Sequence, residues 1–241
     1  FPLVLSLFFV DKLSGGQTQT LESDEAHHAI KVMRLKIGEE IKISDGEGNW
    51  VSGPISEVGK KNLKIDVTAS GIEASKKPEL VLVQALTKSD RNKEMLELVT
   101  VAGVDRIIPW QAERSISKWQ SNSYDKWTSS IKEAGKQSRR VNLPKLEKLM
   151  SAREITEQIS ASDCILVFHE SANEKFSALD ISQNASSVYL IIGPEGGITD
   201  TELEIFKSKG GNLVRLGEPV LRSAHAGFAA LASIQTKLGR W

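Results

Sequence analysis

The stretch LIIGPEGGITDTELEIF, residues 190–206, places an apolar strand and a helix on either side of a Gly-Pro-Glu-Gly-Gly loop. Thr199 and Glu202 have the T-x-x-E spacing of a capping box, which predicts where the helix begins, and Ser151 with Glu154 predicts the cap of another helix. Gly196 and Gly197 can adopt positive φ angles without a Cβ penalty. The loop contains no lysine and matches neither a phosphate-binding P-loop nor the G-x-G-x-x-G fingerprint. It is either a bare backbone surface for a ligand that is not anionic overall, or a turn that simply needs glycine.

Composition and charge narrow the class of protein. The 241 residues are 40% hydrophobic, which is enough to bury a core in two domains. The single cysteine, Cys164, excludes a disulfide framework and favours a reducing cytosol. Four scattered histidines give no zinc-ligand spacing, and the adjacent His27 and His28 would point to different faces of a helix. The apolar residues 1–10 are too few to cross a membrane, so they predict a first β-strand.

The formal net charge is zero, but positive charge gathers in residues 106–148. Ten Lys and Arg stand there against four Asp and Glu, so the segment carries 10 − 4 = +6. It also contains Trp110, Trp119, Tyr124 and Trp127. Cations interleaved with aromatic rings indicate phosphate contacts combined with base stacking on RNA. The alternative is a solvated basic helix face with buried tryptophans.

The first part of the chain predicts a small β-barrel. Residues 41–67 alternate apolar and polar side chains in short runs, with 45–48 as a hairpin loop. The preceding residues 23–38 predict one helix capped by Ser23 or Asp24.

Beyond a predicted linker at residues 69–79, strands and helices alternate. Such alternation predicts a mostly parallel sheet with helices on both faces, and ligands bind beyond the carboxyl ends of its strands. We expect strands at 80–86, 105–110, 145–150, 163–168, 187–192 and 212–217, and helices at 92–104, at 119–136 and from Ser151, Thr199 and Ser223.

Three loops follow predicted strands and define the candidate site: His169–Glu170, Gly193–Gly197 and Gly217–Arg222. The last helix, SAHAGFAALASIQTKLG, is rich in small residues, which permits close approach of a second backbone. As an alternative, alanine is simply the best helix former.

Several ordered blocks carry a family resemblance. ALTKSDRNKEMLELVTVAGVDRIIP, ERS, KQSRRVNLP, LIIGPEGG and LGEPVLR precede the Ala-rich terminal helix. Over essentially its whole length the chain resembles the RsmE family of the SPOUT superfamily, whose members use S-adenosylmethionine to methylate N3 of a uridine in 16S (small-subunit) ribosomal RNA.

The resemblance implies an α/β fold in two domains. Residues 1–72 would form a PUA-like RNA-binding β-barrel. Residues 78–241 would form a SPOUT methyltransferase domain, a mostly parallel sheet with a deep trefoil knot that holds the cofactor. It further implies a cytoplasmic homodimer that acts on the small ribosomal subunit and needs neither a metal nor a membrane.

Carried over by motif, the resemblance implies three groups of cofactor-binding residues. They are Gly193, Pro194, Glu195, Gly196 and Gly197; Leu216, Gly217, Val220, Leu221 and Arg222; and His169 with Glu170. One departure concerns the sequence LRSAHA, where many relatives have Leu-Arg-Thr-Glu-Thr-Ala, so Ala224 replaces an acid. We interpret the neighbouring His225 as a structural histidine rather than a substitute for that acid.

The chemistry indicates which charges matter. S-adenosylmethionine has a cationic sulfonium and no phosphate, which suits a loop without lysine. Uracil N3 bears a proton and becomes a good nucleophile only when the resulting anion is stabilised. We therefore predict Arg140, Lys88 and Arg114 as catalytic, while the sequence names no general base. The predicted RNA-binding residues are Arg34, Lys88, Arg114, Lys136, Gln137, Ser138, Arg139 and Arg140.

Two other functions stay open. A 2′-O-ribose methyltransferase of the same superfamily would share the fold and the cofactor but attack with a hydroxyl group. A non-catalytic RNA-binding assembly factor would keep the barrel and the basic helix without binding S-adenosylmethionine.

Overall fold

The computed structural model describes residues 5–88, 91–182 and 184–241, which fall into two compact units. The first unit contains the chain up to Ser75 together with Gly135–Leu143, and the second contains Lys76–Ala134 and Pro144–Trp241. The predicted domain boundaries, 1–72 and 78–241, stay a prediction.

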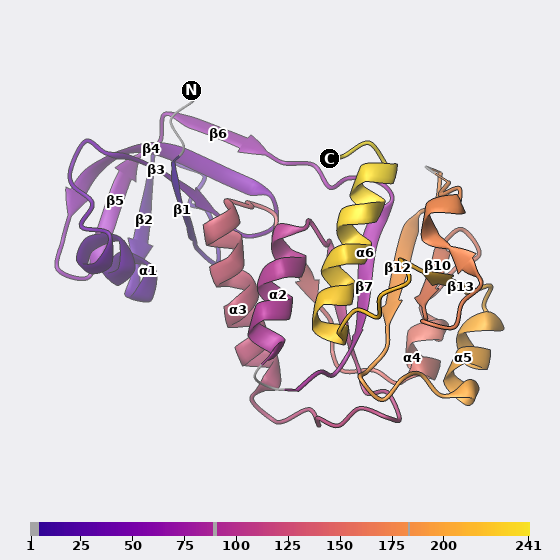
Figure 1. Cartoon of the computed structure of the whole chain (residues 1–241). Helices are drawn as coiled ribbons and strands as arrows, with labels where there is room; N and C mark the ends of the chain where they lie inside the picture. The colour runs from indigo at the N-terminus through magenta and orange to yellow at the C-terminus, as the bar shows by residue number, and fades with distance from the viewer. Residues whose placement is uncertain (1–4, 89–90, 183) are drawn as a thin grey trace. The chain divides into compact units, whose positions relative to one another are not determined.

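The first unit is built on a mixed six-stranded sheet (Figure 1). Strand order is β1-β3-β4-β5-β2, with β6 also paired to β4; β1 runs parallel to β3, and the other pairs are antiparallel. The predicted alternation is confirmed, since Ile41, Ile43, Leu63 and Ile65 are fully or almost fully buried. The strands are β1 (Ser6–Phe9), β2 (Thr18–Glu22), β3 (Glu40–Ser44), β4 (Asn49–Val58), β5 (Asn62–Asp66) and β6 (Ala69–Ile72).

Two predictions about this unit are wrong in detail. The helix expected over 23–38 consists of α1 (Ser23–His27) and a π-helical turn, η1 (His28–Val32), and the residue at its N-cap is Glu22. It ends early because Arg34 has a φ of 57°, a left-handed conformation that a right-handed helix cannot continue through. The expected linker is in part a strand, because β6 completes its hydrogen bonds along β4.

The segment 135–143 is fixed to the hairpin between β3 and β4. Ser44 Oγ donates a hydrogen bond to Val141 O at 2.7 Å. Gly48 N donates to the same carbonyl oxygen at 3.2 Å, and Leu143 N donates to Gly46 O at 2.8 Å. Backbone pairing of this kind, between residues almost one hundred positions apart, places 135–143 in the first unit.

The second unit contains a seven-stranded sheet in the order β11-β13-β10-β12-β7-β8-β9, and all of its strand pairs are parallel. The parallel α/β prediction is therefore confirmed. The knot is not part of this confirmation and stays a prediction. The strands are β7 (Glu79–Ala85), β8 (Arg106–Trp110), β9 (Lys145–Leu146), β10 (Cys164–Phe168), β11 (Glu174–Lys175), β12 (Ser187–Ile192) and β13 (Asn212–Arg215).

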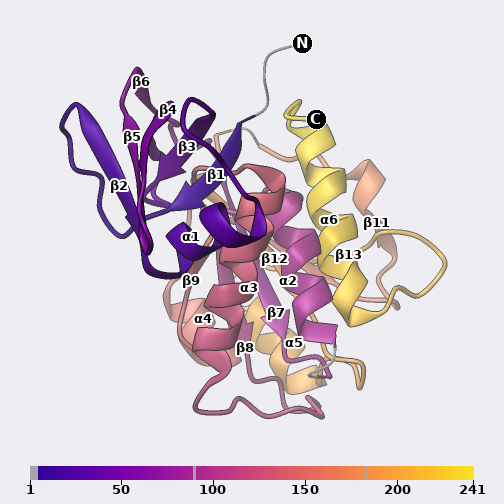
Figure 2. The ribbon, with the colours of Figure 1, turned by 90° about the vertical axis from the view of Figure 1, so that its left-hand side faces the viewer.

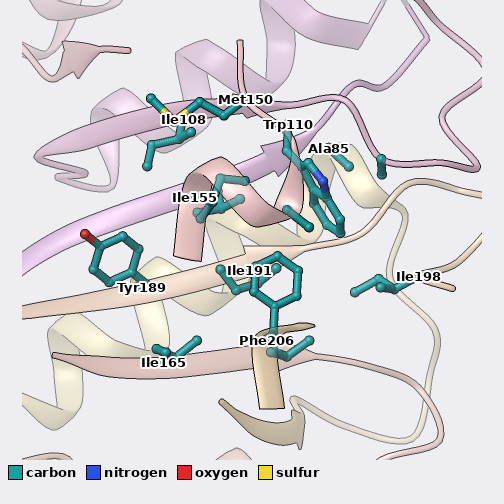
Figure 3. Packing of buried hydrophobic residues seen from close by; sticks show 14 of the residues in the cluster. Ala85, Ile108, Trp110, Met150, Ile155, Ile165, Tyr189, Ile191, Ile198 and Phe206 are labelled. Carbon is teal, nitrogen blue, oxygen red and sulfur yellow. The ribbon is translucent and has the colours of Figure 1, made fainter. Parts of the chain in front are cut away.

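Helices cover both faces of this sheet. On one face, Ile155 of α4 and Phe206 of α5 pack with Ala85, Tyr189 and Ile191 of the strands (Figure 3). On the other face, α6 packs on β7, β12 and α2 (Figure 1 and Figure 2). The helices are α2 (Asn92–Val101), α3 (Ser123–Ser138), α4 (Ala152–Glu157), the 3-10 turn η3 (Phe176–Ala178), α5 (Asp200–Lys207) and α6 (Ser223–Lys237).

Most predicted elements of the second unit are confirmed, although several are shorter than expected. The helix expected from 119 begins at Ser123. The strand expected over 145–150 is regular only at Lys145–Leu146 and pairs with β8 again, at Trp110, through an isolated bridge at Met150. Both predicted capping boxes form. The side chains of Ser151 and Thr199 accept hydrogen bonds from the backbone N–H groups of Glu154 and Glu202, and the carboxylates of Glu154 and Glu202 accept from the backbone N–H groups of Ser151 and Thr199. None of the described helices is long and apolar enough to cross a membrane.

Candidate active site

Two of the three predicted loops meet in a cavity of about 90 Å³ at the carboxyl ends of β10 and β13. These strands are neighbours in the sheet, so the loops that follow them emerge side by side. Six predicted cofactor-binding residues line this cavity: His169, Glu170, Leu216, Gly217, Val220 and Leu221. The structure also adds residues that sequence reasoning missed, namely Phe168, Val214, Arg215, Glu218, Pro219 and Ala226.

His169 is held in place by hydrogen bonds at the end of β10. Its backbone N donates to Val214 O at 2.9 Å, which continues the ladder to β13. Its ring Nδ1 accepts from Ser171 N at 3.2 Å and lies 2.8 Å from Ser171 Oγ. The ring is therefore oriented by its own loop.

The charges of the cavity are mixed, with an acidic excess. Glu170 and Glu218 contribute two carboxylates against the single guanidinium of Arg215. The Arg215 Nε is buried and has no hydrogen-bond partner among the described residues. A buried donor without a partner costs about 1–3 kcal/mol, so a ligand that accepts this hydrogen bond would relieve the cost. In the sequence, the one indication that Arg215 belongs to the site was its position directly before the predicted binding residue Leu216.

The loop 193–197 forms a tight turn after β12. Gly197 N donates to Pro194 O at 2.9 Å, and Gly197 has a φ of 79°, as expected for a glycine in the left-handed region. The expectation of a positive φ at Gly196 is wrong. This position needs glycine for a different reason, because a Cβ there would lie 2.9 Å from Arg114 O.

A buried hydrogen-bond chain connects this loop to α6 and the sheet. Ser223 Oγ donates to Gly193 O at 2.6 Å and accepts from Gln84 Nε2 at 3.1 Å. Gln84 lies in the middle of the sheet and is fully buried. Gln84 and Ser223 therefore fix the start of the loop 193–197, and no motif in the sequence indicated this role.

A second connection runs through Glu202, which is 7% exposed. Its Oε2 accepts from Thr199 N at 3.1 Å and from Thr199 Oγ1 at 3.0 Å. Its Oε1 accepts from Glu113 N at 2.9 Å. The next residue, Arg114, donates from Nη1 to Gly196 O at 3.4 Å. The loop after β8 is thereby tied to the loop after β12.

The predicted RNA-binding residues lie in both units. Lys88 and Arg114 are exposed after β7 and β8 of the second unit. The others belong to the first unit, where Arg34, Gln137 and Arg139 are exposed and Ser138 and Arg140 are half-buried. Lys136 is half-buried as well, and its Nζ lies 2.7 Å from Glu25 Oε1, so its charge is engaged within the first unit.

The aromatic residues of the basic segment are not a continuous stacking surface. Trp110 is fully buried and Trp127 is 3% exposed, so for these two the alternative of buried tryptophans is right. Tyr124 is 45% exposed, with its hydroxyl donating to Leu146 O at 3.2 Å. Trp119 is half-buried and meets Trp127 edge to face, with ring centroids 5.1 Å apart.

The remaining predicted residues, including those of the loop 193–197, lie outside the lining of the 90 Å³ cavity. Arg222 precedes α6 at its N-cap. Ala224 is fully buried at the start of α6. His225 lies 3.4 Å from Glu94 of α2, a contact between helices that fits a structural histidine. No cluster of three or more metal-ligand side chains occurs in the described part of the chain.

Comparison with known proteins agrees with this arrangement. Residues 74–235 match a family described as an RNA methyltransferase domain, and residues 21–68 match an RNA methyltransferase PUA domain. The ribosomal RNA small subunit methyltransferase E of Mycobacterium bovis is 34% identical over 99% of this chain and 94% of its own length. The protein of the same name from Bacillus subtilis is 29% identical over 92% of each chain.

Among solved structures, a ribosomal RNA small subunit methyltransferase E from Neisseria gonorrhoeae, bound to S-adenosyl methionine, has a TM-score of 0.88 at 25% identity. The likeness covers 97% of this chain and 98% of the other. With parallel strands, loops that converge at their carboxyl ends and similarity along its whole length, the chain belongs to the ribosomal RNA small subunit methyltransferase E family.

Proposed function

We propose that this protein methylates N3 of a uridine in 16S ribosomal RNA with S-adenosylmethionine as the methyl donor. One observation carries the proposal most directly: the loops after β10 and β13 converge on one cavity with a mixed, acidic lining. The loop after β12 is tied to the same edge of the sheet through Ser223 and Gln84. This is the edge at which parallel α/β sheets bind ligands.

The residues present fit the proposed donor. S-adenosylmethionine is a cation with one carboxylate, and the cavity offers two carboxylates and one guanidinium with a free buried Nε–H. Gly217 has no side chain and so contributes bare backbone to the cavity. The space beside it is open, since the nearest atom to a Cβ placed there would be Pro219 Cδ at 3.8 Å. The cavity of about 90 Å³ accommodates only part of such a molecule, so the loop 193–197 and Arg222, which are outside its lining, would hold the rest.

S-adenosylmethionine supplies a methyl group that is already activated by its sulfonium. The chain's own task is to place the acceptor and to stabilise the anion that forms when uracil N3 loses its proton. Arg114 is suited to this task because its guanidinium is charged at any working pH and already contacts Gly196 of the cofactor loop. Lys88 follows β7, the strand between β12 and β8, and offers a second exposed cation at that edge. Arg140 is the third proposed catalytic cation, on the strength of the family motif.

We also propose a homodimer. The small residues of α6 do not by themselves require one, because Gly227 packs on Leu82 and Gln84 of the same chain. The stronger indication is the loop before α6, where Val220 is 72% exposed and Leu221 is 42% exposed. Large apolar side chains at such exposure favour a partner surface. Light scattering should show a dimer at micromolar concentration, and a monomer would refute this part of the proposal.

The proposed function is tested by titration calorimetry followed by transfer of labelled methyl groups. We expect the protein to bind S-adenosylmethionine and to label isolated small ribosomal subunits but not large ones. A protein that binds RNA but not S-adenosylmethionine would instead be the non-catalytic assembly factor. Label in the ribose rather than the base would indicate the 2′-O-methyltransferase alternative.

A further inference from the structure

A second and larger cavity lies in the second unit, away from the loops described above. It has a volume of about 490 Å³ and is lined by α2, by the loop before α3 and by the first part of α3. Its apolar wall consists of Leu86, Leu96, Trp119 and Trp127. Pockets that bind small organic groups have volumes of about 300–1,000 Å³, so this groove is large enough for a nucleobase with its sugar.

The rest of the lining is polar and positively charged. Lys93, Lys118 and Lys126 stand against Glu133, which gives 3 − 1 = +2. Lys93 is paired with Glu97 at 3.8 Å, but within the described ranges Lys118 and Lys126 form no ion pair and both are exposed.

Hydrogen-bonding groups complete the rim. Side-chain amides of Asn92, Gln120 and Asn122 and four serine hydroxyls line the groove. Asn92 Oδ1 accepts from Thr87 Oγ1 at 2.7 Å, which leaves its amide hydrogens available to a ligand. An apolar helix of a partner protein would bury these groups without partners, whereas a nucleotide offers both acceptors and donors.

The aromatic pair in the groove has a geometry that permits stacking. Trp119 and Trp127 meet edge to face at 66°, so each ring keeps at least one flat face that the other does not cover. Trp127 is almost fully buried, which makes it the support, and the half-buried Trp119 is the ring available to a ligand. Nucleobases stack on such rings without regard to sequence.

The groove is connected to the cofactor loops through a single segment. Arg114, in the first half of the loop 111–122, contacts Gly196, and residues 117–120 and Asn122, in the second half, line the groove. Leu86, in the groove, directly follows β7. The sheet neighbour of β7 is β12, which ends at Ile192 and leads into the loop 193–197. Both sites therefore lie at the carboxyl-end edge of one sheet.

We propose that this groove binds an unpaired nucleobase of the RNA substrate, next to the nucleotide that is methylated, by stacking on Trp119 while Lys118 and Lys126 contact the phosphates. The inference rests on the proposed function for the identity of the RNA. It adds a stacking site to the substrate-binding surface of the second unit.

The first test measures the affinity of Trp119 variants for a short fluorescein-labelled oligouridylate by anisotropy, without S-adenosylmethionine. Stacking of one base contributes about 1–3 kcal/mol, so Trp119→Ala should weaken binding about 5- to 150-fold. Trp119→Phe, which keeps a flat ring, should retain most of the affinity. The matched control is Trp241→Ala, which removes an exposed tryptophan outside the groove and should change nothing.

The second test uses two lysines of the groove, Lys118 and Lys126, whose side chains are exposed. Lys118→Ala combined with Lys126→Ala should weaken oligouridylate binding and flatten its dependence on salt, because fewer counterions are released. Lys76→Ala combined with Lys209→Ala, two exposed lysines outside the groove, is the charge-matched control. If Trp119→Ala does not fold, this double variant decides the question alone.

Unchanged affinity in folded Trp119→Ala and in the double lysine variant would overturn the inference. Unchanged RNA affinity with an altered oligomeric state would show that the groove is a protein interface, which also overturns it. Binding of S-adenosylmethionine by each variant provides the control for folding. Because oligouridylate binding is measured without methyl transfer, its failure is separate from failure of the proposed function, which would appear as a wild-type protein that methylates no ribosomal RNA.

Discussion

Replacing Glu202 by glutamine should destabilise the protein and weaken the connection between the loops after β8 and β12. The carboxylate accepts hydrogen bonds from Thr199 N, Thr199 Oγ1 and Glu113 N, and its side chain is buried. A glutamine keeps one acceptor oxygen but presents an N–H₂ group where the second oxygen was. This group faces N–H donors whichever way the amide is turned, so at least one buried donor loses its partner.

The magnitude follows from the bonds that are lost. A hydrogen bond to a charged group contributes about 1.5–3 kcal/mol, and an unsatisfied buried donor costs about 1–3 kcal/mol. Because these two terms overlap, we expect Glu202→Gln to lower the free energy of unfolding by about 2–4 kcal/mol. For a unit of this size, that corresponds to a decrease in Tm of about 5–15 °C. Affinity for S-adenosylmethionine should fall as well, since Glu202 ties the loop after β8 to the start of α5.

The assay is scanning calorimetry combined with titration of S-adenosylmethionine. Glu204→Gln provides a matched control on the same helix, because the Glu204 side chain is 71% exposed and pairs with Lys207 at 2.9 Å. An exposed pair of this kind contributes at most about 1 kcal/mol. The reasoning is refuted if Glu202→Gln lowers Tm no more than Glu204→Gln does.

Three further predictions concern individual side chains. Gly196→Val should weaken S-adenosylmethionine binding in a folded protein, because a Cβ 2.9 Å from Arg114 O must displace the loop; undiminished affinity by calorimetry would contradict the loop assignment. Arg140→Ala should leave cofactor binding intact and cut turnover by about 100-fold, whereas Arg139→Ala should mainly lower the salt-dependent affinity for RNA. Equal and small effects of the two substitutions on turnover at saturating RNA would show that the catalytic charge lies elsewhere. Burial raises the pKa of the Cys164 thiol, so iodoacetamide should label it more slowly than free cysteine at mildly alkaline pH, and rapid labelling would show that the thiol is accessible.

Local signals in the sequence predicted much of the second unit. The two capping boxes formed as predicted because their donors and acceptors lie three residues apart in the chain. The strands β7, β10 and β12 were predicted because strands buried on both faces are continuous apolar runs. The loops of the candidate site were predicted from the expected parallel sheet alone, because ligands bind beyond the carboxyl ends of its strands.

Features that depend on distant pairing could not be predicted in this way. The strand β6 has an unremarkable sequence and is fixed by hydrogen bonds to β4. The chain from Gln84 through Ser223 to Gly193 joins residues more than one hundred positions apart, and nothing in the local sequence indicates it. Trp119 was predicted as part of an aromatic stripe, but only the structure separates it from the buried Trp110 and Trp127.

Methylation of uracil N3 in small-subunit ribosomal RNA can be detected by mass spectrometry of nucleosides. Small ribosomal subunits would be isolated from cells that lack this protein, incubated with the purified protein and S-adenosylmethionine, and digested to nucleosides. We expect 3-methyluridine to be absent before incubation and to appear afterwards in the small-subunit RNA. The appearance of 2′-O-methyluridine instead, or of no methylated uridine with a protein that binds S-adenosylmethionine, would contradict this expectation.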